Sequence, residues 1–195
     1  MYKGHQLRRF AQGRDRETSE NERGLEKTPN VEPRTTPKPI VILSQCLEQE
    51  ACRYNAQRVR DDFVREIGPF VEFVATCPEV EIGLGVPRDP IRLVRIGESP
   101  RLIQPTTGRD LTAAMQVYAT RFLGELGAVD GFILKNRSPS CGIEDVKVYA
   151  EPGNSPSVGT RPGVFARAVL ERYGDVAVDP GRLDGPAAAP SSRAA

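Results

Sequence analysis

Three of the four cysteines in this chain stand in equivalent places, shortly after apolar runs. Cys46 follows "PIVILSQ", Cys77 follows "FVEFVAT" and Cys141 follows "GFILKNRSPS". Such runs are typical of strands buried on both faces of a parallel sheet. Because the carboxyl ends of parallel strands meet at one edge of a sheet, where ligands bind, we expect these three thiols to converge. Cys52 is expected at or near the start of the helix that follows Cys46.

Several thiolates at one site indicate zinc or an iron–sulfur cluster. Structural zinc usually brings a close C-x₂-C pair, which is absent here, and the single histidine, His5, lies in a polar N-terminal segment. Three widely separated thiolates fit a cubane cluster with one iron left open as a Lewis acid. Two alternatives stay open: any one cysteine is a small core residue, or Cys52 is a fourth ligand of a structural or sensing site.

The composition is that of one globular domain. The chain has 195 residues, of which 38% are hydrophobic and 27% charged, with a net charge of +1. This balance argues against a strongly electrostatic nucleic-acid or membrane-surface protein. No run approaches the roughly 18 apolar residues of a membrane span, and no signal-peptide pattern occurs. We expect a cytoplasmic protein whose cysteines are thiols, ligands or catalysts rather than disulfides.

Both ends of the sequence are polar and of low complexity. Residues 1–38 are charged and punctuated by proline and threonine, and residues 184–195 read "DGPAAAPSSRAA". Segments of this composition cannot bury enough apolar surface to offset the entropy of ordering them. The sequence therefore predicts disordered tails at 1–38 and 184–195 around one folded domain at 39–183.

Within 39–183, strand patterns alternate with helix patterns. Helices are predicted at 55–67, 110–126 and 163–173. Strands are predicted at 39–44, 70–75, 128–135, 146–150 and 175–179, with a hairpin of 91–96 and 101–105 at the sheet's margin. This order predicts an α/β fold, a mainly parallel sheet covered by helices in a Rossmann-like three-layer arrangement.

Five segments carry a family resemblance: "SQCLEQEACRYN", "CPEVEIGLGVPRDPIRLV", "GRDLTAAM", "KNRSPSCGIEDVKVY" and "PGVFARAVLERY". They resemble the successive motifs of the thiouracil desulfurase family, over about residues 39–183. The resemblance implies a 4Fe–4S cluster held by three cysteines, here Cys46, Cys77 and Cys141, and non-redox removal of sulfur from a thiolated pyrimidine. "CPEVEIGLGVPR" is most similar to longer fusion members resembling tRNA 4-thiouridine desulfidases, whose second domain we do not expect here. The chain departs from the family at "CLEQ" and "RYNA", where C-L-L-G and R-Y-D-G are usual.

Glu79 is the candidate general base of such a reaction. A thiocarbonyl sulfur is a soft ligand for an open iron, which makes the attached ring carbon electrophilic toward water. Glu79, two residues after Cys77, would stand beside the cluster and take the proton of that water. Glu81 is the second candidate. The alternative role of Glu79 is that of an exposed loop carboxylate or a partner for Arg88.

Ser138, Ser140, Asn136, Arg53 and Tyr54 are the remaining candidate site residues. The two serines flank a proline just before Cys141, and the glycine after it permits a tight turn, so their hydroxyls can be aimed at the cluster and the substrate. We expect a catalytic role for Ser138 and substrate binding by Ser140. Asn136 either binds a pyrimidine edge or ends its strand. Arg53 and Tyr54 either clamp a base or belong to the surface.

The expected substrate is a small thiopyrimidine. Binding of tRNA needs an extended basic surface, whereas the arginines here are interleaved with aspartate and glutamate. We therefore expect weak activity on tRNA, and a monomer or homodimer. Two alternatives stay open: a non-catalytic cluster- or zinc-binding accessory or regulatory module, and a tRNA 4-thiouridine desulfidase acting with a partner domain.

Overall fold

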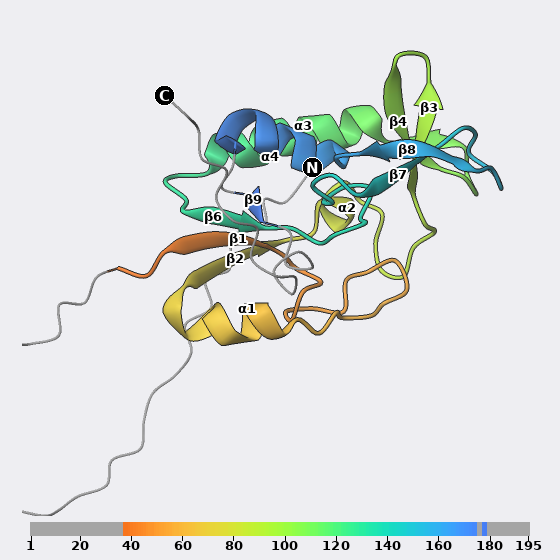
Figure 1. Ribbon diagram of the computed structural model, residues 1–195. Coiled ribbons are helices and arrows are strands. Elements are labelled where there is room, and N and C mark those ends of the chain that lie inside the picture. Colours follow the sequence, from red (N-terminus) through yellow and green to blue (C-terminus); the bar gives the residue numbers. More distant parts are fainter. Residues whose placement is uncertain (1–36, 175–176, 179–195) are drawn as a thin grey trace, which may run out of the picture.

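The protein is a single mixed α/β domain with two sheets (Figure 1). The computed structural model describes residues 37–174 and 177–178. All of the predicted C-terminal tail and residues 1–36 of the predicted N-terminal tail lie outside the described residues. Within the described part, no helix is long and apolar enough to cross a membrane.

The first sheet is parallel and has four strands in the order β2-β1-β6-β9. β1 (Ile40–Ser44) pairs with β2 (Glu72–Thr76) on one side and with β6 (Gly131–Ile133) on the other. β9 (Ala177–Val178) adds to β6. The strands that precede the three predicted cluster cysteines are therefore parallel neighbours, as the sequence argument required.

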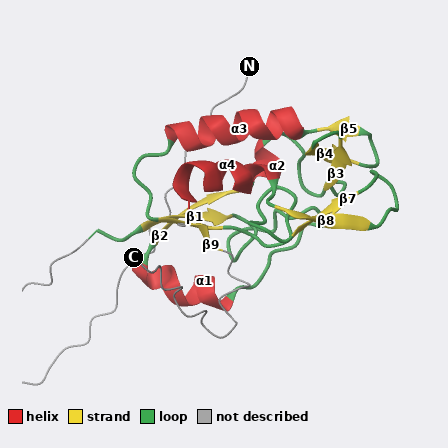
Figure 2. Cartoon of the chain, turned by 45° about the horizontal axis from the view of Figure 1, so that its top comes forward, coloured by secondary structure: helices red, strands yellow, loops and turns green. Residues whose placement is uncertain are grey.

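Helices cover both faces of this sheet (Figures 1 and 2). α1 (Asp62–Ile67) lies on one face, and α3 (Thr112–Glu125) and α4 (Val164–Tyr173) lie on the other. Side chains of a strand point alternately to its two faces. In β1, accordingly, Ile42 packs in the core of α3 and α4, whereas Leu43 packs in the smaller core of α1.

The second sheet is mixed and has five strands in the order β5-β4-β3-β7-β8. β3 (Arg92–Ile96) and β4 (Ser99–Gln104) form the predicted hairpin, and β5 (Arg109–Asp110) extends it. β7 (Val146–Tyr149) pairs in parallel with β3 and antiparallel with β8 (Ser157–Arg161). Two predicted placements were wrong: the hairpin is not on the margin of the parallel sheet, and strand 146–150 does not belong to that sheet. Local periodicity indicates a strand but not its partner.

The predicted helices at 110–126 and 163–173 are confirmed as α3 and α4, but the helix predicted at 55–67 is shorter. α1 begins only at Asp62. The preceding residue, Asp61, is its N-cap, and the Asp61 side chain accepts a hydrogen bond from the N–H of Val64. Residues before it run irregularly, and Val59 forms an isolated bridge with Leu47. The predicted stop at Gly68 forms a short 3₁₀ turn, Gly68–Phe70.

Candidate functional site

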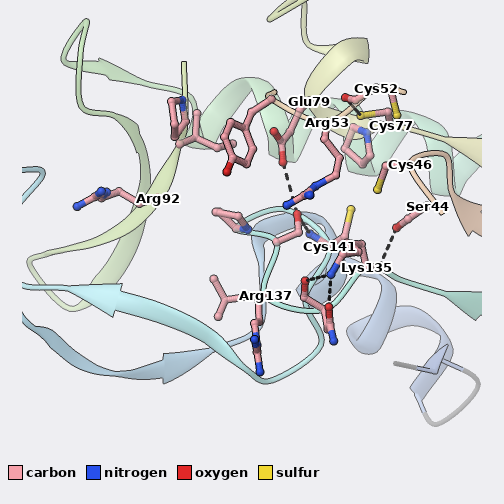
Figure 3. Close-up of a pocket in the computed structure, with 18 of the residues that line it drawn as sticks. Ser44, Cys46, Cys52, Arg53, Cys77, Glu79, Arg92, Lys135, Arg137 and Cys141 are labelled. Atoms are coloured by element: carbon pink, nitrogen blue, oxygen red, sulfur yellow. Dashed lines mark hydrogen bonds between the residues drawn. The ribbon is translucent and has the colours of Figure 1, made fainter. Parts of the chain in front are cut away.

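A cavity of about 580 Å³ opens beyond the carboxyl ends of β1, β2 and β6 (Figure 3). All four cysteines line it. Cys77 directly follows β2, Cys46 comes two residues after β1, and Cys141 lies in the loop after β6. Three thiols from distant parts of the chain thus reach one cavity through three adjacent strands.

Cys52 lies close to this group, but not at the start of a helix as predicted. It precedes a turn well before α1, not the start of that helix, and its side chain is buried. Cys77 Sγ lies 3.8 Å from the carbonyl of Cys52, to which it can donate. Side-chain hydrogen bonding with Cys52 lowers the pKa of the Cys46 thiol and that of the Cys77 thiol. The same bonds raise the pKa of Cys52. Cys46, Cys52 and Cys77 therefore form one group of interacting thiols.

Cys141 is held differently. Burial raises the pKa of its thiol, and a hydrogen bond with the hydroxyl of Ser44 acts against that rise. Ser44 Oγ also accepts a hydrogen bond from the backbone N–H of Lys135 at 2.9 Å. Ser44, at the end of β1, thus links the strand β1 to the sulfur of Cys141, a contact that the sequence analysis missed.

The turn that carries Cys141 packs against the N-terminus of α4. The N–H of Gly142 donates to the carbonyl of Ser138 at 2.9 Å, which closes the turn. At the start of α4, N–H groups of Val164 and Ala166 donate to carbonyls of residues 139 and 140 at 3.1 and 3.0 Å. The first-turn N–H groups of a helix have no partner within the helix. α4 therefore fixes the turn through groups that helices leave unpaired.

Glu79 lies on α2 (Pro78–Glu81), a short helix that Cys77 caps. Its Oε1 accepts hydrogen bonds from the hydroxyls of Ser140 at 3.0 Å and Ser138 at 3.4 Å. Its Oε2 forms an ion pair with Arg88, as one of the alternatives anticipated. Glu81, the second candidate, is exposed and does not line the cavity. The arrangement suits Glu79 rather than Glu81 for proton transfer in the cavity.

The other candidate residues divide into those that line the cavity and one that does not. Asn136, Arg53 and Tyr54 line it, with the Arg53 guanidinium 5.4 Å from the centre of the Tyr54 ring. Asn136 Oδ1 accepts a hydrogen bond from Lys135 Nζ. Ser140 is fully buried and does not line the cavity, but its hydroxyl donates to Glu79 and its N–H donates to Ser138 Oγ, and both of these residues line it.

Several lining residues were missed by the sequence analysis because they come from the second sheet and its flanking loops. The guanidinium of Arg92 lies 4.5 Å from the centre of the Tyr149 ring, and Figure 3 shows Arg92 across the cavity from Cys46, Cys52 and Cys77. The cationic residues of the lining outnumber its two carboxylates, Glu79 and Asp145. A positive cavity favours negatively charged thiolates and sulfide. The cationic lining residues are Arg53, Arg88, Arg92, Lys135, Arg137 and Lys147.

The types and spacing of the possible ligands indicate which metal group the cavity could hold. Among residues 37–174 and 177–178, no three His, Cys, Asp or Glu side chains converge closely enough to hold one metal ion. A cubane cluster places its ligands on separate irons, so its cysteines stand farther apart than those of a single ion. Cys46, Cys77 and Cys141 could hold such a cluster, since thiolates are the ligands that iron–sulfur clusters use.

Comparisons with known proteins agree with this geometry. The solved structure of the thiouracil desulfidase TudS, described as 4Fe-4S-dependent, is 31% identical and superposes with a TM-score of 0.56, covering 73% of this chain and 90% of that chain. The uncharacterized protein YbbK of Bacillus subtilis (strain 168) is 29% identical over 110 residues, 53% of this chain and 73% of its own length. The family model described as 2-thiouracil desulfurase matches residues 41–180. The chain belongs to the 2-thiouracil desulfurase family.

Proposed function

We propose that this protein removes sulfur from thiolated pyrimidines, thiouracil or 4-thiouridine, with a 4Fe–4S cluster held by Cys46, Cys77 and Cys141 and one iron left open. The observation that carries the proposal is the meeting of these thiols and Glu79 in one cavity beyond three adjacent parallel strands. The cluster requirement of TudS, 31% identical, supports the cofactor. The parallel sheet between α1 and the pair α3 and α4 would serve as a Rossmann-like three-layer support.

The reaction is a hydrolysis without net electron transfer. When bound, the cluster supplies a Lewis-acidic iron for the soft thiocarbonyl sulfur. Glu79 accepts the proton of the attacking water through Oε1, the oxygen on which the hydroxyls of Ser138 and Ser140 converge. The carbon–sulfur bond is replaced by a carbon–oxygen bond, and the sulfur leaves as hydrosulfide. Ser138 Oγ also accepts a hydrogen bond from the N–H of Cys141 at 3.1 Å. Ser138 therefore connects the base Glu79 to the turn that carries Cys141.

Residues that line the cavity would bind the substrate. A cavity of about 580 Å³ is of the size that takes a small molecule. Arg53 and Tyr54 would stack on the pyrimidine, Asn136 would bind its edge, and Ser140 would act on it indirectly through Glu79. We propose small thiopyrimidines as substrates, with weak activity on tRNA, in a cytoplasmic monomer or homodimer.

One observation favours a second candidate, a non-catalytic cluster- or zinc-binding accessory or regulatory module. Cys52 lies within hydrogen-bonding reach of Cys46 and Cys77, so a fourth thiol is at hand. A fourth protein ligand would close the open iron and leave no place for substrate. Loss of the cluster in Cys52→Ala, together with an inactive wild type, would favour this second candidate.

Anaerobic reconstitution tests the main proposal. The protein should bind about four irons, as a cubane requires, and should release sulfide from 2-thiouracil or 4-thiouridine with formation of the oxo product. Single alanine substitutions of Cys46, Cys77 or Cys141 should abolish both results. Reconstituted protein with a full cluster that releases no sulfide from any thiopyrimidine contradicts the proposed activity. A tRNA substrate processed faster than the free nucleoside would contradict the small-substrate assignment alone.

A further inference from the structure

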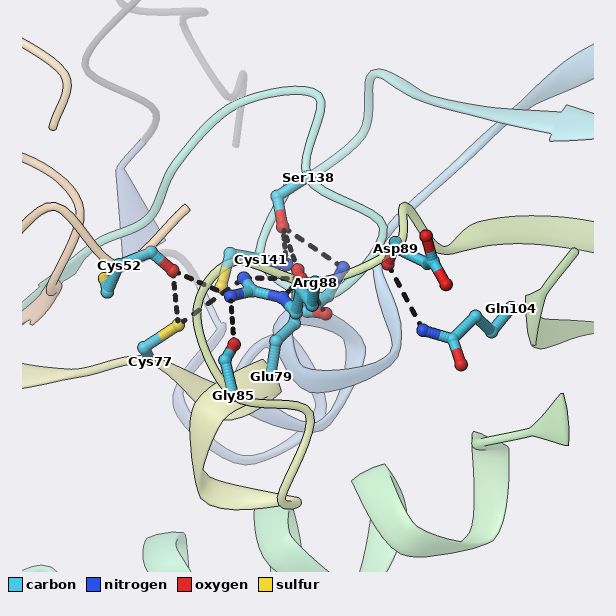
Figure 4. Close-up of polar contacts among 10 residues, drawn as sticks. Cys52, Cys77, Glu79, Gly85, Arg88, Asp89, Gln104, Ser138 and Cys141 are labelled. Carbon is cyan, nitrogen blue, oxygen red and sulfur yellow. Dashed lines mark hydrogen bonds and ion pairs between the residues drawn. The ribbon is translucent and has the colours of Figure 1, made fainter. Parts of the chain in front are cut away.

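Arg88 has no role in the reaction described above, yet its side chain contacts Cys52, Cys77, Glu79 and Gly85 (Figure 4). Its side chain is only 4% exposed. Nη1 donates to the carbonyl of Cys52 at 2.8 Å and to the carbonyl of Gly85 at 3.0 Å. Nε and Nη2 lie 2.9 and 2.8 Å from Oε2 of Glu79, and Nη2 lies 3.9 Å from Sγ of Cys77. One guanidinium thus joins the loop of Cys52, the ligand Cys77 and the base.

These contacts divide the two oxygens of Glu79 between different partners. Oε2 receives both guanidinium contacts. Oε1 accepts hydrogen bonds from the hydroxyls of Ser140 and Ser138. Of these two serines, Ser138 lines the cavity. A carboxylate bonded at both oxygens cannot rotate about its last torsion without losing partners. Arg88 therefore fixes the plane of the carboxylate and keeps one of its two equivalent oxygens on the side of Ser138.

We propose that Arg88 is a positioning residue that acts through Glu79, holding Oε2 so that Oε1 faces the water to be deprotonated. The inference rests on the proposed function and adds to it a residue that orients the base. Lysine is a point charge on a flexible stem, whereas the guanidinium is a rigid fork that donates in several directions. Arg88→Lys should accordingly keep the charge but lose much of the orientation.

The test is a double-mutant cycle of Arg88→Met and Glu79→Gln, measured on anaerobically reconstituted protein. Arg88→Met should lower kcat by on the order of 10–10²-fold, the effect of a displaced catalytic group, with KM changed by less than about threefold. In the Glu79→Gln background the same substitution should have almost no further effect, because the group it positions is already disabled. Each variant is also characterised by its iron content, its melting temperature and, in cluster-free protein, the hydrogen exchange of residues 51–54.

Arg101→Met is the matched control. Arg101 forms the same kind of contact, with Nε and Nη2 at 2.8 and 2.7 Å from one oxygen of Asp110, but on β4 and outside the cavity lining. It should leave kcat and iron content unchanged. If Arg88→Met does not fold, the cycle is run with Arg88→Lys, which should show the same non-additivity with a smaller loss.

Equal fold losses from the Arg88 substitution in both backgrounds would overturn the positioning role, because an effect independent of Glu79 is merely structural. A rise in KM with kcat unchanged would also overturn it and assign Arg88 to substrate binding. Both results require an active wild type, and so leave the proposed function standing. A wild type that holds its cluster but releases no sulfide would overturn the proposed function and the role of Arg88 together.

Discussion

Gly163→Ala should destabilise the turn that carries Cys141. A Cβ at Gly163 would lie 2.5 Å from the carbonyl carbon and oxygen of Ser140 and 2.8 Å from the carbonyl oxygen of Pro139. These are backbone atoms, which cannot turn aside as a flexible side chain does. The N–H of Gly163 also donates to the carbonyl of Gly142 at 2.8 Å, so the two segments cannot separate without stretching that bond. The methyl group must therefore push the turn away from α4.

The loss in free energy of unfolding has two parts, the added methyl group and the weakened hydrogen bond. One extra methyl group in a closely packed place costs about 1–3 kcal/mol, and a weakened hydrogen bond adds about 0.5–1.5 kcal/mol. For a folded unit of this size, each kcal/mol lowers the melting temperature by roughly 3–4 °C. Gly163→Ala should therefore lower the melting temperature of the reduced, cluster-free protein by about 5–18 °C, and should reduce the iron bound after reconstitution.

Thermal unfolding followed by circular dichroism, with iron analysis alongside, measures both effects. Gly124→Ala is the control, because Gly124 lies in α3 and no atom would come within 4 Å of its added Cβ. Alanine there should stabilise the protein by about 0.5–1 kcal/mol through its higher helix propensity. If Gly163→Ala melts at or above the wild-type temperature and binds iron normally, the contact between α4 and the ligand turn is not the constraint that we describe.

Tyr118→Phe should lower the free energy of unfolding by about 1–2 kcal/mol, because it removes the 2.5 Å hydrogen bond to the buried Thr76 hydroxyl; an unchanged urea midpoint contradicts this. Burial raises the pKa of Tyr118, so the unfolded chain loses the phenol proton first, and wild-type stability should fall above about pH 10. Urea unfolding at increasing pH should show a shallower fall for Tyr118→Phe, and equal slopes would argue against the raised pKa. Ser138→Ala should slow sulfide release by about 10-fold. In this variant Glu79 loses one hydrogen-bond donor, and the N–H of Cys141 loses its acceptor. Full activity would show that Ser138 has no role in the reaction. Cys52→Ala should retain about four irons, and a colourless protein would make Cys52 a ligand.

The sequence by itself determined most of the site's chemistry and the elements that carry it. Hydrophobic periodicity reports which residues are buried, so strand runs before the cysteines and the stripe of α3 were predictable. The parallel edge then followed from strand–helix alternation, and the predicted residues Glu79, Ser138 and Asn136 do line the cavity. Arg53 and Tyr54 line it too, although the helix predicted to follow them begins later.

Only the tertiary structure decided how these residues are held. Strand pairing depends on partners far apart in the chain, so the second sheet, which supplies Arg92 to the cavity wall, was not evident from local patterns. The ion pair of Arg88 with Glu79, the closeness of Cys52 to Cys46 and Cys77, and the hydrogen bond of the buried Ser140 to Glu79 depend on how separate loops meet. Sequence patterns specify residue types and buried faces, whereas hydrogen-bond partners are selected when buried polar groups must find one another in the packed core.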